Sequence, residues 1–106
     1  MKRTFVTGAA LAAFALPALA GSSWTVPSTV VELVNTSNGG FNVRLSPDLS
    51  GCVSQSGYGG VYASVYPTHP GLNRIKADLT VAFTTGARVA LWMTDECTVA
   101  ETRLFQ

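Results

Sequence analysis

The stretch FTTGARVALWMTDEC, residues Phe83–Cys97, joins the end of a helix-like pattern to a strand-like pattern and a cysteine. Apolar side chains just upstream recur with the helical period and fall within an arc of about 100°, the width of a stripe that faces a core. Gly86 follows this pattern where glycine often ends a helix, and Pro70 stands near its start. The pattern therefore predicts a helix over residues 71–85 and a strand over residues 88–93. The residues expected to face the core from the helix are Leu72, Ile75, Leu79, Ala82 and Phe83.

Four further strands are predicted on either side of this region. TVVELVN, residues 29–35, is rich in β-branched residues, and FNVRL, residues 41–45, alternates strictly between apolar and polar side chains. The intervening NTSNGG supplies the Asn and Gly that a hairpin turn favours. VYASVY, residues 61–66, alternates again, and ETRLF, residues 101–105, can form the last strand, whereas residues 21–27 are expected to form a loose arm. The inward strand residues are expected to be Val43, Leu45, Val65, Val89 and Leu91.

The resulting order is three strands, one helix and two strands. This order is typical of the five-stranded OB barrel, whose helix lies between the third and fourth strands. A ferredoxin-like fold is the alternative, but it requires a helix after the first strand. The predicted class is therefore mainly β, a small five-stranded OB-like barrel with one α-helix between strands 3 and 4.

The N-terminus has the layout of a secretory signal peptide. Lys2 and Arg3 precede an apolar run that ends in Pro17 and the small-residue motif of residues 18–20. The run is shorter than the roughly 20 residues that a bilayer span requires. We expect residues 1–20 to be a signal peptide, residues 21–106 to be a single OB-like domain, and the protein to be secreted or periplasmic, with no membrane span.

Two cysteines, Cys52 and Cys97, lie in the expected mature domain. Exported proteins meet an oxidising compartment, where thiols pair, and a small domain gains much from a covalent link. A disulfide between the two cysteines is the simplest interpretation. A nucleophile or a metal ligand at Cys97 would need partner groups that a chain with one histidine does not supply.

The charge and the motifs of the sequence argue against several classes of function. Without Lys2 and Arg3, five basic residues remain against six acidic ones, so the mature chain lacks the basic excess of a nucleic-acid binder. The single histidine, His69, stands in a turn before the helix, and Asp95 and Glu96 resemble turn residues more than a catalytic carboxylate pair. The sequence shows no metal-ligand spacing and no phosphate loop. We expect no enzyme, no metal and no cofactor.

The same central stretch also resembles a known family. A helix ending in Thr-Gly, a basic residue, Val-x-Leu-Trp-x-x-Asp-x-Cys and a partner cysteine about 45 residues upstream resemble small exported bacterial proteins similar to the receptor-binding B subunit of subtilase cytotoxin. The residues that carry the resemblance are Ala82, Thr85, Gly86, Val89, Leu91, Trp92, Asp95, Cys97, Cys52 and the THPG motif before the helix. The resemblance implies an OB fold with one intrachain disulfide. The toxin subunits form five-membered rings and bind sialylated glycans. The resemblance therefore implies that this protein binds glycans and assembles as a homopentamer.

A binding surface is expected on the outer face of the second and third predicted strands, the face with which OB folds often hold oligosaccharides. Tyrosines can stack on sugar rings, and Asn, Ser and Arg can hold polar groups. The alternative is that these are ordinary residues of an exposed sheet. The candidate ligand-binding residues are Asn42, Arg44, Tyr62, Ser64, Tyr66 and Trp92.

Trp92 and the helix leave alternatives open. Alternation places Trp92 on an outer face, where it can be a ligand platform, a subunit contact, or a residue covered by the arm around Trp24. Ala77, Val81 and Thr84 lie opposite the core-facing stripe of the helix and suit packing around a ring axis. The expected function is an exported glycan-binding or receptor-binding protein in a ring oligomer; the alternative is a monomeric exported protein that binds another protein or resides in the envelope.

Overall fold

The computed structural model describes residues 23–94 and 97–106. The expected signal peptide, residues 1–20, and the expected turn residues Asp95 and Glu96 lie outside the described residues. The elements in chain order are β1 (Ser23–Trp24), β2 (Thr29–Asn35), β3 (Phe41–Ser46), the 3₁₀ turn η2 (Gln55–Gly57), β4 (Tyr62–Val65), α2 (Leu72–Thr85), β5 (Val89–Met93) and β6 (Val99–Leu104). From β2 onward, the order of strands and α-helix is the predicted one.

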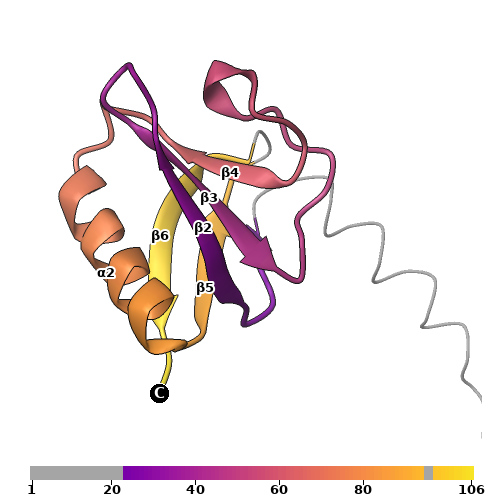
Figure 1. Ribbon diagram of the computed structural model, residues 1–106, viewed down its shortest axis with the longest axis vertical. Coiled ribbons are helices and arrows are strands. Elements are labelled where there is room, and N and C mark those ends of the chain that lie inside the picture. The colour runs from indigo at the N-terminus through magenta and orange to yellow at the C-terminus, as the bar shows by residue number, and fades with distance from the viewer. Residues whose placement is uncertain (1–22, 95–96) are drawn as a thin grey trace, which may run out of the picture.

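The strands form two three-stranded antiparallel sheets, with the orders β1-β5-β6 and β2-β3-β4 (Figure 1). Single bridges join the sheets at two places, one between Ser28 and Val89 and one between Ser64 and Thr98. At the first bridge, Ser28 and Val89 exchange two backbone hydrogen bonds of 2.8 Å. The structure thus shows a mainly β protein built of two linked sheets, where the sequence predicted one five-stranded barrel.

The first strand corrects the expectation of a loose arm over residues 21–27. Ser23 and Trp24 pair with Met93 and Trp92 along the edge of β5. Thr25 continues this contact, since its N–H donates to the carbonyl of Leu91 at 2.9 Å and its hydroxyl accepts from the N–H of Leu91 at 3.0 Å. The segment Ser23–Trp24 therefore forms a strand because it pairs with the free edge of β5, although its sequence has no strand pattern.

The core lies between the two sheets and α2, which runs beside β6 and β2 in Figure 1. All five strand residues expected to point inward are buried. On the helix, Ile75, Leu79 and Ala82 are buried and Leu72 is partly buried. Other members of the core are Val30, Phe41, Ala63, Met93 and Val99.

Phe83 was expected in this core, and that expectation is wrong, because 48% of the residue is exposed. Each helical residue advances by about 100°, which places Phe83 at the margin of the stripe set by Ile75, Leu79 and Ala82. It also lies in the last turn of α2, since Gly86 ends the helix in the left-handed conformation (φ 79°). The sheets cover the centre of the stripe and leave its margin open.

The disulfide between Cys52 and Cys97 is confirmed. Cys52 lies in the long connection between β3 and β4, and Cys97 lies between β5 and β6, 45 positions further along the chain. The bond therefore ties the connection of one sheet to the hairpin of the other. Of the helices in residues 23–94 and 97–106, none has the length and apolar character needed to cross a membrane.

Candidate functional site

A row of polar side chains crosses the outer face of sheet β2-β3-β4. Glu32 on β2 is paired in register with Arg44 on β3, and Arg44 is paired with Tyr62 on β4. Residues that are paired directly across neighbouring strands have side chains on the same face, within contact distance. The register therefore brings a carboxylate, a guanidinium and a phenol together, with their buried neighbours Val43 and Ala63 on the opposite face.

Hydrogen bonds fix the orientation of this row. The hydroxyl of Tyr62 donates to Oε1 of Glu32 at 2.8 Å. Arg44 donates from Nε and Nη2 to the two carboxylate oxygens of Asp48, at 3.0 and 3.3 Å. Tyr58 lies edge-on to Tyr62, with ring centroids 5.7 Å apart and an interplanar angle of 68°. We call Glu32, Arg44, Asp48, Tyr58 and Tyr62 the tyrosine–charge cluster.

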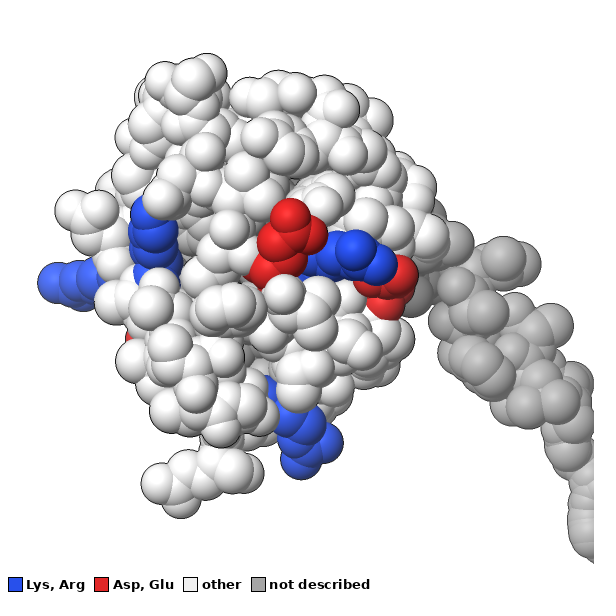
Figure 2. Space-filling view, viewed as in Figure 1, with Lys and Arg blue, Asp and Glu red and all other residues white. Residues whose placement is uncertain are grey.

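The electrostatics of the cluster follow from these contacts. The hydrogen bond to Glu32 raises the pKa of the Tyr62 hydroxyl, and desolvation and the charge of Glu32 act in the same direction. The hydrogen bond from Arg44 lowers the pKa of the Asp48 carboxyl, and the hydrogen bond to Asp48 raises the pKa of the Arg44 guanidinium. The cluster thus combines one basic side chain, Arg44, with two acidic ones, Glu32 and Asp48. Figure 2 shows acidic and basic side chains side by side near the centre of this face.

The cluster has the components of a polar binding surface. Tyr58 is 46% exposed, so its ring is open to a ligand from solvent. Carboxylates accept hydrogen bonds, and a guanidinium donates them in a fixed planar geometry. Of these five residues, the sequence identified Arg44 and Tyr62 and missed Glu32, Asp48 and Tyr58. Alternation along β2 did not mark Glu32, because the pairing register of β2 shifts between Val30 and Glu32. Nothing in the long connection marked Asp48 or Tyr58.

Asn42 and Ser64 were expected to be exposed on this face, and that expectation is wrong. Asn42 is 0% exposed and Ser64 is 1% exposed. The Ser64 hydroxyl donates to Oδ1 of Asn42 at 2.9 Å and accepts from the backbone N–H of Gln55 at 2.9 Å. Nδ2 of Asn42 donates to the carbonyl of Gln55 at 3.0 Å. Both side chains do point away from the core, but the connection that contains Gln55 covers them.

Gln55 anchors this covering connection through its own side chain. Its Nε2 donates to the carbonyls of Phe41 and Val65, at 2.8 and 3.0 Å, and its Oε1 accepts from Nδ2 of Asn38 at 2.9 Å. The side chain thus bridges β3 and β4 where their pairing begins. The polar connection SPDLSGCVSQSGYGG is therefore held against the sheet at Gln55, where it covers Asn42 and Ser64.

Tyr66 and Trp92 lie away from the cluster. Tyr66 follows the last residue of β4, four positions from Tyr62, which corresponds to roughly 13 Å along an extended chain. Trp92 belongs to the other sheet, half-buried, with its ring edge-on to that of Trp24 at a centroid distance of 5.4 Å. The guanidinium of Arg103 lies 5.1 Å from the ring centroid of Trp24. Of the alternatives for Trp92, contact with the N-terminal arm is the one that the structure shows.

His69 connects the turn before α2 to the neighbouring sheet. Its Nδ1 accepts from the backbone N–H of Gly71 at 2.8 Å, and its Nε2 lies 3.2 Å from the carbonyl oxygen of Ala100. These contacts are those of a residue that positions the start of a helix. In the part of the chain that the structure describes, no three or more His, Cys, Asp or Glu residues are grouped so as to hold a metal ion.

Comparison of the chain with protein-family models, with curated proteins and with solved structures finds no match. The function proposed below therefore rests on the geometry of the tyrosine–charge cluster.

Proposed function

We propose that this chain is an exported, non-enzymatic binding protein that holds glycans on the tyrosine–charge cluster. Strands β2 to β6 would act as a five-stranded OB-like barrel. Two bridges support this arrangement. Ser28, just before the first of the five strands, pairs with Val89 of the fourth, and Ser64 of the third pairs with Thr98, just before the fifth. In an OB barrel, the face of strands 2 and 3 is a common site for oligosaccharides.

The observation that carries the proposal is the pair of tyrosine rings beside three oriented charged groups. The apolar faces of a sugar ring pack on aromatic rings, and its hydroxyls need donors and acceptors with fixed directions. The bonds Tyr62–Glu32 and Arg44–Asp48 provide such directions before a ligand arrives. A preorganised site loses less side-chain entropy on binding than a mobile one.

The charges favour neutral glycans over sialylated ones. Arg44 is the single cation of the cluster, and both of its bonded nitrogens point to Asp48. The carboxylate of a sialic acid would have to compete with Asp48 and approach Glu32, which repels it. The preferred ligand therefore differs in charge from the one that the toxin-subunit resemblance implies.

A ring oligomer would give weak sites useful avidity. The solvent side of α2 supports such an assembly because Ala77, Val81 and Thr84 are all exposed there. The hydroxyls of Thr80 and Thr84 donate to the carbonyls of Lys76 and Thr80, so both hydroxyls are bonded within the helix. The resemblance implies five subunits. A monomer that binds another protein is the alternative, and light scattering after size-exclusion chromatography distinguishes the two.

A glycan array probed with the mature protein tests the proposal. We expect binding to neutral oligosaccharides, reduced at least tenfold by Tyr58→Ala and by Arg44→Ala. Tyr66→Ala is the matched control, since Tyr66 is also an exposed tyrosine but lies outside the cluster. Each variant should first show the circular dichroism spectrum of the wild type.

Two results would contradict the proposal. If a confirmed oligomer bound no glycan, the proposed glycan-binding function would be wrong. Glycan binding that Tyr66→Ala abolishes and Tyr58→Ala leaves intact would move the site away from the cluster.

A further inference from the structure

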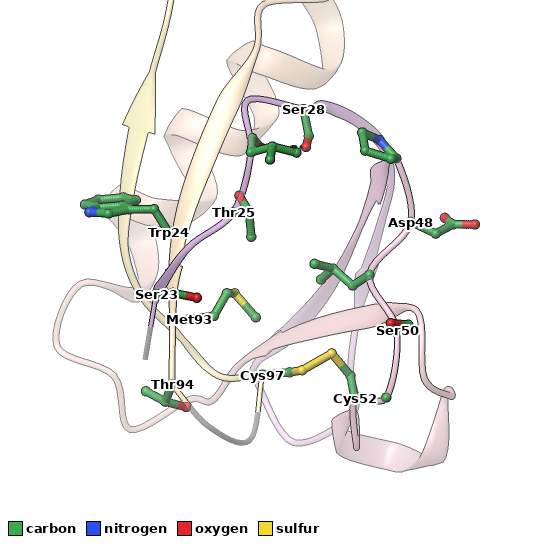
Figure 3. Close-up of a pocket in the computed structure, with 14 residues that line it drawn as sticks. Ser23, Trp24, Thr25, Ser28, Asp48, Ser50, Cys52, Met93, Thr94 and Cys97 are labelled. Carbon is green, nitrogen blue, oxygen red and sulfur yellow. Dashed lines mark hydrogen bonds between the residues drawn. A yellow bond between two sulfur atoms is a disulfide. The ribbon is translucent and has the colours of Figure 1, made fainter. Parts of the chain in front are cut away.

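A separate cavity of about 410 Å³ lies between the first described residues of the chain and the connection after β3 (Figure 3). Three segments line it: residues 23–28, residues 47–52, and the end of β5 with Cys97. Small-molecule sites in proteins typically have volumes of about 300 to 1,000 Å³. The cavity is thus large enough for a small organic ligand.

The floor of the cavity is apolar and rich in sulfur. Met93, which is 7% exposed, and the Cys52–Cys97 disulfide point into the space between the two segments in Figure 3. Leu49 and Val26 add aliphatic surface to the lining. Thioether sulfur makes favourable contacts with aromatic rings, at about 5 Å from the ring. A flat aromatic ligand therefore suits this floor.

Several polar side chains of the lining already have partners. The Ser28 hydroxyl donates to the carbonyl of Val26 at 2.7 Å, and Oγ1 of Thr94 accepts from the N–H of Thr98 at 3.2 Å. Asp48 is the one ionisable side chain among the lining residues, and its carboxylate is bound by Arg44. An anionic ligand would meet no cation in the lining, and a cationic one would have to displace Arg44.

We propose that this cavity binds small uncharged aromatic molecules. A cavity of about 150 Å³ is known to hold benzene, so the larger volume here accommodates two or three rings. The site lies apart from the tyrosine–charge cluster, and binding there does not depend on the proposed glycan function. Asp48 is the single residue that contributes to both.

A pair of related fluorescent probes provides the test. N-phenyl-1-naphthylamine is uncharged, and 8-anilinonaphthalene-1-sulfonate has the same ring skeleton with an added negative charge. We expect saturable one-to-one binding of the uncharged probe to the mature, oxidised protein, and at least tenfold weaker binding of the sulfonate. Amide shifts in NMR spectra should change within residues 24–28 and 47–52.

A matched pair of variants locates the site independently. Val26 lines the cavity and is 63% exposed, and Val53 lies outside the lining and is 78% exposed. Val26→Trp should fill the cavity and weaken binding of the uncharged probe at least tenfold, whereas Val53→Trp should leave it within twofold. Four results would overturn the proposal: no saturable binding, equal affinity for both probes, equal effects of the two variants, or shift changes confined to another face.

Discussion

At the scale of single residues, Gln55 decides which side chains of sheet β2-β3-β4 meet solvent. Its side chain bonds to Phe41, Val65 and Asn38, and it is 5% exposed. A buried polar group stabilises a fold only when its hydrogen bonds are made. Gly40, in the turn between β2 and β3, lies so close to the carbonyl of Val65 and the side chain of Gln55 that no Cβ fits there.

Gly40→Ala should therefore destabilise the protein by about 1 to 3 kcal/mol. An added Cβ would overlap with the carbonyl oxygen of Val65 and lie 2.9 Å from Oε1 of Gln55. Gly60→Ala is the control, because a Cβ there would lie 3.6 Å from the nearest atoms, an ordinary contact. Urea unfolding of both variants measures the difference, and equal losses of stability would show that Gly40 is not packed against Val65 and Gln55 as described.

The charge of Asp48 gives a second prediction at this scale. Because Arg44 lowers the pKa of Asp48, the pair stabilises the folded state above the unfolded-state pKa of about 3.9, and this stabilisation is lost as the pH falls through the folded-state pKa. Arg44→Ala should move the pKa of Asp48 back towards its usual value in an NMR titration. Arg74→Ala should leave it unchanged, and an unchanged pKa in Arg44→Ala would argue against the ion pair.

At the scale of elements, the periodicity of the sequence predicted which side chains of a strand or helix face the core. The alternation in β3 and the helical stripe of α2 each describe one segment, so their inward residues could be identified without knowing the neighbours. Alternation also placed Asn42 and Ser64 on the outer side of their strands correctly. It could not show that Gln55 covers them, because these contacts join residues 13 and 9 positions apart that share no repeating pattern.

The short strand β1 escaped prediction for a related reason. Ser23 and Trp24 have no strand pattern, and their order comes from the free edge of β5. Phe83 was misplaced for a different reason. The helical period predicts which side of α2 faces the core, but it does not predict how much of that side the sheets cover. Within the cluster, Arg44 and Tyr62 were predictable from strands, whereas Asp48 and Tyr58 come from the connection.

The phase of α2 can be tested with two substitutions. Leu79 is fully buried and Val81 is 47% exposed. Leu79→Ala should cost about 2 to 5 kcal/mol of unfolding free energy, and Val81→Ala should cost less than about 1 kcal/mol in the monomer. Thermal unfolding at low protein concentration measures both. Similar costs for the two variants would contradict the orientation of the helix.

At the scale of the whole molecule, the disulfide joins the two sheets through their connections. Cys52 belongs to the segment that covers sheet β2-β3-β4, and Cys97 precedes β6. The bond holds one wall of the cavity and the segment that carries Asp48 and Tyr58. The cavity and the tyrosine–charge cluster thus depend on the same covalent link.

Replacing both cysteines by alanine should lower the unfolding free energy by up to about 4 kcal/mol, because the unfolded chain regains the entropy of a loop of about 45 residues. Guanidinium unfolding of the wild type under reducing conditions should give a similar loss. Equal stability of the oxidised, reduced and double-alanine forms would show that the link contributes nothing to the fold.

An NMR titration of the isotope-labelled mature protein with the neutral oligosaccharide selected by the glycan array tests the central claim most directly. The account predicts saturable shift changes centred on Glu32, Arg44, Asp48, Tyr58 and Tyr62, and much weaker ones with the sialylated form of the same oligosaccharide. Changes centred on Trp24 and Trp92, stronger binding of the sialylated form, or no saturable change would contradict it.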